Sequence, residues 1–344
     1  MNWIRTSPKL FLYLAIFLII ACKDESIVPQ QTTKPEQIQA TLESLELLDD
    51  YPLYTMQYHG DYGFDDYLRT GVLNAPPGKT AHRQSASPSP RFACTCFAAM
   101  GASQSMVFSR NFDFFHRPTL MLFTDPPNGC ASVSMVDMYY LGYDGSRSLE
   151  TLDDREILLQ APYLPFDGMN EYGVTIGMMA VPNAEPPFDP NKVTIYELAL
   201  IRLVLDYATT TEDAIRLIGK YNLAVGSIPV HFLIADPSGH SAVIEFVNGK
   251  MHVLPNTELW QVATNFIIYG SNAPEQTSCW RYDAAYSDLK KATGKKTRDS
   301  AMVLLQRVAQ ESTMWSIVFD MSNVKVQVTV GQNFSQVYSF DVTP

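Results

Sequence analysis

The sequence predicts an α+β fold in which helices are stacked on the faces of antiparallel sheets. Its 344 residues, 46% of them hydrophobic, suffice for a sizeable core in one large domain or two small ones. Strand-like patterns come first, helical patterns follow in the middle, and strand-like patterns return at the end. The 22 Pro, 18 Gly and 12% aromatic residues are typical of a loop-rich globular protein with substantial sheet.

The leading part of the chain is predicted to contain a short helix, an aromatic segment and a connector. Residues 36–50 carry four aliphatic side chains at helical spacing, which predicts an amphipathic helix. These are Ile38, Leu42, Leu45 and Leu48. Residues 51–68 are too aromatic for a free linker and are expected to pack on the main body. Residues 75–91 are rich in Pro and Ser and are expected to be an exposed connector.

The main body begins with β-rich runs separated by turn residues, which predict an antiparallel sheet. These runs are residues 91–97, 106–108, 132–139 and 174–181. A helical hairpin is expected next. Its first helix spans residues 193–207, and its second begins at a cap, Thr210 or Thr211, and ends near Lys220. The apolar stripe of the first helix is Ile195, Leu198, Ile201 and Leu205.

The last third of the chain is predicted to contain one β-hairpin, two helices and two closing strands. Strand runs at residues 231–235 and 241–246 flank the turn sequence DPSG. Helical patterns cover residues 282–292 and 298–310, and strands are expected at 315–319 and 324–330.

Charge and cysteine content exclude several classes of function. The chain has 25 Lys and Arg against 36 Asp and Glu, a formal charge of −11, and no basic run that could follow a phosphate backbone. We therefore expect no nucleic-acid partner. The five Cys form no CxxC pair and the six His lack metal-ligand spacing, so we expect neither a metal nor another cofactor.

The N-terminal segment predicts export. Arg5 and Lys9 precede an apolar run at residues 10–20, which has the length of a secretory h-region. The run ends in LIIAC, which resembles a bacterial lipobox and implies a lipoprotein signal peptide over residues 1–21, a lipid on Cys22 and a tether over residues 22–35. A plain signal peptide or an N-terminal anchor with an incidental cysteine stays open. The choice between the periplasmic face and the cell surface also stays open.

The most informative stretch is ACTCF followed by SRNFDF. It places Cys94, Arg110 and Asp113 at offsets of zero, sixteen and nineteen. This pattern resembles the cysteine N-terminal-nucleophile (Ntn) hydrolases, which include choloylglycine hydrolases, penicillin V acylases, acid ceramidase and penicillin-type acyltransferases. The resemblance covers nearly all of residues 94–344. It implies a four-layer αββα sandwich of two antiparallel sheets between helical layers.

Further family motifs follow in the expected order. The segment DGMNEYG at residues 167–173 looks like the family's DGMNEKG, and HFLIADPSGHSAVIEF matches its central hairpin. The resemblance makes Asn265 the oxyanion asparagine and Arg281 a second active-site arginine, with TMWS at residues 313–316 as the closing strand. Asn170 is taken as structural or secondary.

An N-terminal cysteine carries its own base, because an α-amino group titrates near ~7.7–8.0 and can take the proton of the thiol. Cys94 must first become residue one. Its thiol is therefore expected to attack the Ala93 carbonyl and cleave the chain, which separates a leading fragment (residues 36–93 with the tether) from a catalytic domain (residues 94–344). The two fragments are expected to stay associated, because the leading fragment has apolar surface to bury.

The roles of the charged residues follow from their chemistry. Asp113 is expected to hold the new α-ammonium group, and Arg110 to favour the thiolate and bind substrate. Asn265 is expected to supply an N–H group to the tetrahedral oxyanion. Arg281 is expected to position Asn265 or to counter the developing charge.

One residue departs from the family pattern. Where bile-salt hydrolases have Asn in the strand after DGMNEKG, this chain has Ala180, so bile-salt specificity is doubtful. The connector ahead of Cys94 favours the acyltransferase- and ceramidase-like members, which release a longer leading fragment.

The same residues also have less specific interpretations. Cys96 is expected to be a core thiol, and Cys130 and Cys279 to be free thiols, although an oxidising envelope would permit a disulfide. Arg110 and Asp113 have an alternative as an ordinary surface ion pair. His116 is more simply a turn cap than a base, and the Met and aromatic excess is more simply core.

The leading hypothesis is an autoproteolytic zymogen, anchored in the envelope, that hydrolyses the linear C–N amide bond of small N-acyl compounds through its thiol or transfers their acyl group. The competing hypothesis is a surface lipoprotein that binds a ligand on the same fold without catalysis. The substrate, the choice between water and an amine as acceptor, and homo-oligomerisation stay open.

Overall fold

A computed structural model describes residues 34–73 and 93–342, apart from residues 103, 116, 227 and 276. The predicted signal peptide, Cys22, nearly all of the tether, the connector and His116 lie outside the described residues. Within the described ranges, no helix is both long enough and apolar enough to cross a membrane.

The larger sheet has nine strands, and its neighbours are antiparallel except for the parallel pair β2 and β5. In spatial order the strands are β1 (Glu46–Asp49), β2 (Leu53–Tyr58), β5 (Thr119–Thr124), β6 (Ser132–Asp137), β7 (Asp167–Asn170), β8 (Thr175–Ala180), β11 (Val230–Ala235), β12 (Ser241–Val247) and β13 (Lys250–Pro255).

The second sheet has six strands, and all its neighbours are antiparallel. Their order is β14 (Trp260–Ala263), β3 (Ala93–Ala99), β4 (Val107–Asp113), β15 (Thr313–Asp320), β16 (Lys325–Val330) and β17 (Tyr338–Asp341). A small parallel pair is formed by β9 (Thr194–Tyr196) and β10 (Asn222–Ala224).

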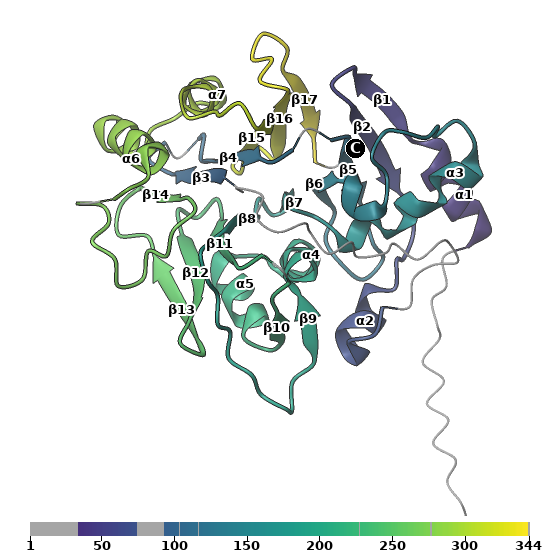
Figure 1. The fold of residues 1–344 in the computed structure, drawn as a ribbon, viewed down its shortest axis with the longest axis horizontal. Helices are drawn as coiled ribbons and strands as arrows, with labels where there is room; N and C mark the ends of the chain where they lie inside the picture. Colours follow the sequence, from purple (N-terminus) through teal and green to yellow (C-terminus); the bar gives the residue numbers. More distant parts are fainter. Residues whose placement is uncertain are drawn as a thin grey trace, which may run out of the picture. The chain divides into compact units, whose positions relative to one another are not determined.

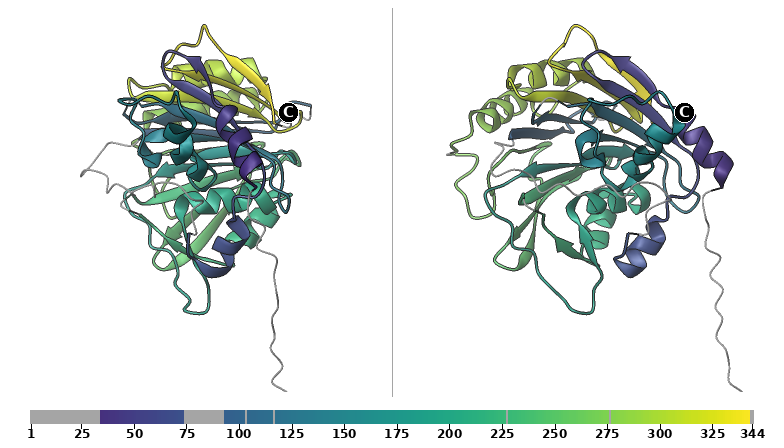
Figure 2. Two further views of the ribbon diagram at one scale, coloured as in Figure 1. Left: turned by 90° about the vertical axis from the view of Figure 1, so that its right-hand side faces the viewer. Right: turned by 45° about the vertical axis from the view of Figure 1, so that its right-hand side comes forward.

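Helices cover the outer faces of the two sheets, as Figures 1 and 2 show. On the six-stranded sheet, α6 (Trp280–Ala292) and α7 (Arg298–Arg307) contact β3, β4, β14 and β15. On the nine-stranded sheet, α4 (Glu197–Tyr207) and α5 (Thr211–Ile218) contact β7, β8 and β11. The remaining helices are α1 (Pro35–Glu43), α2 (Phe64–Thr70), α3 (Leu152–Arg155) and the 3₁₀ segments η1 (Met138–Leu141) and η2 (Glu156–Tyr163). The predicted α+β fold with four αββα layers is confirmed.

Local sequence explains why these elements form where they do. The Oγ1 atom of Thr210 accepts a hydrogen bond from the backbone N–H of Asp213, so Thr210 is the predicted cap of α5. All four residues of the predicted stripe before and within α4 are buried. The β-hairpin around residues 236–239, the helices near residues 282–292 and 298–310, and the closing strands are confirmed.

The helix predicted over residues 36–50 is wrong in its second half. The helix ends at Glu43, because the hydroxyl of Ser44 donates to the carbonyl groups of Thr41 and Gln57 and ties the chain to β2. Residues 46–49 then form the edge strand β1. Ile38, Leu45 and Leu48 still pack on the core, so the apolar pattern marked burial correctly and secondary structure incorrectly.

The two sheets approach each other closely where β8 lies against β3 and β4. A Cβ atom on Gly177 would come within 3.2 Å of the sulfur of Cys96 and of the ring of Phe108. Stacked aromatic side chains fill the space beside this contact, with the ring centroids of Phe112 and Trp315 4.1 Å apart. The aromatic and Met excess is therefore largely core, as predicted.

Residues 34–73 are an integral part of the described structure. Strand β2 forms a ladder with β5 over its whole length. Beyond it, Tyr62, Phe64 and Tyr67 are buried among side chains of the later chain. The hydroxyl of Tyr62 donates to the Oδ2 atom of buried Asp206 at 2.7 Å. The aromatic segment thus packs on the main body, as predicted.

The Tyr62 hydroxyl is expected to contribute measurably to stability. Tyr62→Phe leaves the buried carboxylate of Asp206 short of one donor, so the free energy of unfolding in urea should fall by about 1–3 kcal/mol. Tyr54→Phe is the control, because the Tyr54 hydroxyl has a longer, half-buried contact of 3.3 Å with Tyr143. Equal losses in the two variants would contradict this role of Tyr62.

Candidate active site

The structure brings all five predicted site residues together at the start of β3. Cys94 is the second residue of β3, and Arg110 and Asp113 lie on the neighbouring strand β4. Asn265 follows the end of β14, which pairs with β3 on its other side. Arg281 is the second residue of α6, which packs over β3 and β14. Cys94, Arg110, Asp113 and Arg281 are buried, and Asn265 is half-buried.

The guanidinium group of Arg110 extends from β4 toward the sulfur of Cys94 on β3, with 3.7 Å between the Nη2 and Sγ atoms. Its side chain is fully buried and forms an ion pair with Asp167 at 2.7 Å. Main-chain carbonyl groups of Phe166 and Met178 also accept from it. The alternative of a surface ion pair between Arg110 and Asp113 is therefore wrong.

Burial raises the pKa of the Cys94 thiol above its usual range, although the charge and hydrogen bond of Arg110 act in the opposite direction. Only 2% of Cys94 is exposed. In the intact chain, the guanidinium group alone does not outweigh the cost of removing a thiolate from water. The thiol therefore needs a further base.

Asp113 is the last residue of β4 and is paired in the ladder with Ala93, the first residue of β3. Its carboxylate accepts hydrogen bonds from the hydroxyl of Thr313 and the side-chain amide of Gln310. Burial raises the pKa of Asp113 to about 6 against the effect of these two bonds. A carboxyl group in this position can pair with a positive charge that develops on the nitrogen of Cys94.

Asn265 and Arg281 hold the main chain of Cys94. The Oδ1 atom of Asn265 accepts from the backbone N–H of Cys94 at 2.6 Å and from the Nη2 group of Arg281 at 3.0 Å. Arg281 also donates to the carbonyl oxygen of Cys94 and to the hydroxyl of Thr95. The side-chain amide of Asn265 donates to the carbonyl oxygen of Ala180 at 2.8 Å. The N–H of the Ala93–Cys94 peptide bond is thus fixed by a side chain 171 residues away.

Several residues that complete this site were not singled out from the sequence. Asp167 binds Arg110 and accepts from the indole N–H of Trp315 at 3.0 Å. Gln310 and Thr313 bind Asp113. A signal for Asp167 was present, since a carboxylate at the start of a buried strand is costly unless it is paired. Its partner could not be read without the sheet register.

Other predicted roles of single residues are settled by the contacts. Cys96 is a fully buried core thiol, and Cys130 and Cys279 are free thiols, as expected. Asn170 is structural, since its amide donates to two carbonyl groups at the end of α4 and its oxygen accepts two N–H groups of the following turn.

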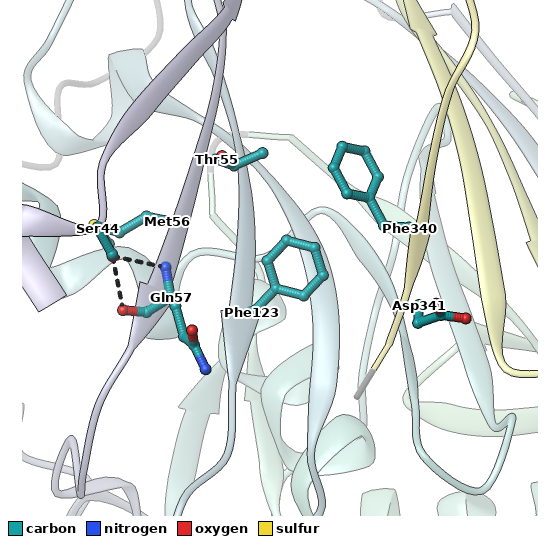
Figure 3. A pocket seen from close by; sticks show the side chains of 7 residues that line it. All are labelled: Ser44, Thr55, Met56, Gln57, Phe123, Phe340 and Asp341. Carbon is teal, nitrogen blue, oxygen red and sulfur yellow. Dashed lines mark hydrogen bonds between the residues drawn. The ribbon is translucent and has the colours of Figure 1, made fainter. Parts of the chain in front are cut away.

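The described residues contain cavities that are separate from this group. One, of about 390 Å³, lies where the strands β2, β5 and β17 meet, beside the rings of Phe123 and Phe340 (Figure 3). Another, of about 240 Å³, has walls of tyrosine side chains from α2, η1, η2 and β9. Neither is lined by the five predicted residues. In the part of the chain that the structure describes, no three His, Cys, Asp or Glu side chains gather in a way that could hold a metal ion.

Comparisons with known proteins find one matching protein family and several similar solved structures. A family model described as linear amide C–N hydrolases, choloylglycine hydrolase family, matches residues 94–284 and thus begins at Cys94. Penicillin V acylase from Agrobacterium tumefaciens has a similar structure, with 19% identity, a TM-score of 0.54, and coverage of 73% of this chain and 86% of that one. A conjugated bile acid hydrolase from Clostridium perfringens is similar at 15% identity, with a TM-score of 0.51 and coverage of 72% and 92%. No match is found among curated proteins.

The titration of Asp113 should be visible in the stability of the intact chain. Its folded pKa of about 6 exceeds its ordinary value of 3.8, so the folded chain binds more protons than the unfolded chain between these pH values. The free energy of unfolding should therefore fall by up to about 3 kcal/mol from this group as the pH rises from 4 to 7.

Asp113→Asn cannot titrate and should lack this part of the pH dependence. Urea unfolding at pH 4 and pH 7 measures the difference, with both chains in the Cys94→Ala background so that they remain covalently identical. An unchanged pH dependence in the Asn variant would show that the carboxyl group titrates normally.

Proposed function

The chain belongs to the choloylglycine hydrolase family of linear amide C–N hydrolases, and on this premise we propose that it becomes active by cleaving itself before Cys94. The Ntn-type resemblance stated from the sequence is confirmed by the family match. The observation that carries the proposal is the environment of Cys94, whose thiol lies 3.7 Å from the Arg110 guanidinium while its N–H is bound to Asn265.

Self-cleavage uses groups that are already in place. The thiol of Cys94 attacks the carbonyl carbon of Ala93, the C–N bond breaks, and the released nitrogen takes up the thiol proton. Water then hydrolyses the thioester, which leaves a carboxylate on Ala93 and restores the thiol. The hydrogen bond of Asn265 to the N–H group and that of Arg281 to the next carbonyl group restrain the peptide unit during this step.

Turnover follows the same chemistry with a substrate amide. The new α-amine takes the thiol proton, and the thiolate attacks the substrate carbonyl carbon. One N–H of the Asn265 side-chain amide donates to Ala180, and we assign the other to the developing oxyanion, while Arg281 donates to the amide oxygen and holds the amide in position. The C–N bond breaks and the leaving amine receives the proton. Water then hydrolyses the thioester, whereas attack by a second amine would transfer the acyl group instead.

Asp113 and Arg110 stabilise the two charged groups of this mechanism, the α-ammonium group and the thiolate. Asp113 lies opposite Ala93, so its carboxylate is suited to pair with the α-ammonium group that forms when the bond breaks. Arg110 supplies a permanent positive charge beside the sulfur, which lowers the cost of the thiolate once the amine has accepted the proton.

We propose that the leading fragment remains bound after cleavage. Strand β2 lies inside the nine-stranded sheet between β1 and β5, and Tyr62, Phe64 and Tyr67 are buried against later residues. Removing these groups from the core would expose several large aromatic side chains, each worth about 1.5–3 kcal/mol on burial. A lipid on Cys22 would then keep the catalytic fragment at the envelope through the leading fragment.

The substrate class we propose is small N-acyl compounds with a linear amide bond. The structurally similar proteins are a penicillin V acylase and a conjugated bile acid hydrolase. Ala180 stands where bile-salt hydrolases have an asparagine, so conjugated bile acids fit less well than N-acyl amino acids, acyl-homoserine lactones or the side-chain amides of β-lactams. A panel of these amides, tested on the processed protein with Cys94→Ala as the control, identifies the class.

A binding protein without catalysis is the second candidate, favoured by the raised pKa and deep burial of the Cys94 thiol in the intact chain. Iodoacetamide separates the two. Fast and selective alkylation of Cys94 in the purified protein supports catalysis, whereas reaction no faster than that of a model thiol favours the binder.

Self-cleavage predicts a specific set of masses. Intact mass spectrometry under reducing and denaturing conditions should show a fragment of residues 94–344 with a free N-terminal cysteine. Cys94→Ala should remain a single chain, because no thiol is present to attack Ala93.

Cys96→Ala is the matched control, since Cys96 lies two residues along the same strand and its variant should still be cleaved. An active wild-type preparation that remains uncut through Ala93–Cys94 would overturn the mechanism.

Lipid anchoring through Cys22 predicts that loss of this cysteine changes the cell fraction in which the protein is found. Cys22→Ser removes the thiol that receives the lipid, so the protein should move from the membrane fraction to the soluble extract of cells that process lipoproteins. The measurement is immunoblotting of the two fractions. Retention of the serine variant in the membrane fraction would instead indicate an uncleaved N-terminal anchor.

A further inference from the structure

A buried histidine and glutamate form a pair that the mechanism above does not use. His231 lies on β11 and Glu245 on the neighbouring strand β12 of the nine-stranded sheet. Both side chains are fully buried, and the Nδ1 atom of His231 is 2.8 Å from the Oε1 atom of Glu245. Burying two ionisable groups is costly unless their hydrogen-bonding capacity is used.

The remaining hydrogen bonds of the pair go to one loop that leaves the other sheet. The Nε2 atom of His231 is 2.7 Å from the carbonyl oxygen of Thr264, the first residue after β14. Glu245 accepts from the backbone N–H groups of Ile268 and Tyr269, each at 2.8 Å. The loop is therefore held at both its ends, and Asn265 lies between the two attachment points.

The proton positions follow from the partners. A carbonyl oxygen only accepts, so the Nε2 atom of His231 must carry a proton. Glu245 receives two backbone N–H groups and the Nδ1 atom, which is the pattern of an ionised carboxylate. Burial raises the pKa of Glu245, but these hydrogen bonds outweigh it and leave the pKa below its usual range. The pair is thus a hydrogen-bonded clamp, in which His231 donates to the carbonyl group of Thr264 and Glu245 accepts from the N–H groups of Ile268 and Tyr269.

The side chain of Asn265 is also bound to the nine-stranded sheet. Its amide donates to the carbonyl oxygen of Ala180 on β8. Ala180 is paired with Val230, the residue before His231. The main-chain clamp and this side-chain bond therefore place Asn265 against one end of β8 and β11, where its oxygen meets the N–H of Cys94.

We infer that His231 and Glu245 are positioning residues that hold the loop of residues 264–269, and with it Asn265, against Cys94. This inference rests on the proposed function, because it concerns the group that would stabilise the oxyanion. A displacement of such a group by about 1 Å is enough to reduce turnover by about 100-fold. The pair acts across the two sheets, from β11 and β12 to the end of β14.

The test removes the pair as a unit. The double variant His231→Leu/Glu245→Leu removes both partners together, which folded proteins tolerate far better than the loss of one partner. Glu245→Gln is the second variant, which keeps the shape of the side chain and loses acceptor capacity. Ile234→Val and Ile244→Val on the same two strands are matched controls, because both side chains are buried and lie on the opposite face of these strands from His231 and Glu245.

Three readouts are measured on the complete protein after cleavage, with both fragments present. They are the melting temperature, hydrogen exchange of peptides covering residues 264–270, and kcat and KM for an amide substrate. We expect faster exchange in this loop and a fall in kcat of about 10- to 100-fold, with KM changed less than about threefold. The controls should lower the melting temperature as much without these two effects.

The outcomes separate this inference from the proposed function. Unchanged loop exchange, or faster exchange with unchanged kcat, overturns the inference, as does an equal loss of kcat in the controls. If the wild type is neither processed nor active, the proposed function fails. Loop exchange still tests the clamp in that case, and an unchanged rate in the variants rejects it.

Discussion

The buried guanidinium group of Arg110 is the interaction on which the site depends. It extends from the six-stranded sheet, lies beside the sulfur of Cys94 and forms an ion pair with Asp167 on the nine-stranded sheet. A charge buried this deeply is costly unless it is paired and hydrogen-bonded, and two main-chain carbonyl groups accept from its Nη1 and Nη2 atoms in addition to Asp167. The ion pair therefore fixes the distance between the sheets at the point where the chemistry is proposed.

The intact chain combines a prepared site with an inactive nucleophile. Burial keeps the Cys94 thiol protonated, and the nitrogen that would serve as its base is still part of a peptide bond. If the proposed cleavage occurs, the contacts that hold this peptide bond would also hold the free amine, because Asn265 binds its N–H and Asp113 lies opposite Ala93. The proposed cleavage would therefore require little rearrangement of the site.

Much of the fold and of the candidate site could be predicted from the sequence, for identifiable reasons. Hydrophobic period and turn residues are local, so the hairpin of β11 and β12 and the helices α5 to α7 were placed correctly. Helix α4 was predicted to begin at residue 193, whereas residues 194–196 form β9 and the helix begins at Glu197. The five candidate site residues were named because the spacing of three of them and the order of the later motifs match a family pattern, and the structure brings all five together. Residues 46–49 were misassigned because helical spacing and a half-buried edge strand expose similar faces over four residues.

The residues that support the site were not predictable in the same way. Asp167, His231 and Glu245 act through partners 57, 33 and 23 residues away, and these partners are set by sheet register and by the stacking of two sheets. A single sequence shows that each is an ionisable residue within an apolar strand, which indicates that it must be paired. The sequence does not show which residue is the partner.

The parallel ladder between β2 and β5 has a consequence for biosynthesis. Residues 53–58 cover one side of β5 completely. A catalytic fragment made without them would present a bare row of N–H and C=O groups, which is a template for intermolecular β-pairing. Synthesis as one precursor supplies that strand in every molecule at a one-to-one ratio, so the leading segment would suppress aggregation for as long as the two pieces stay together.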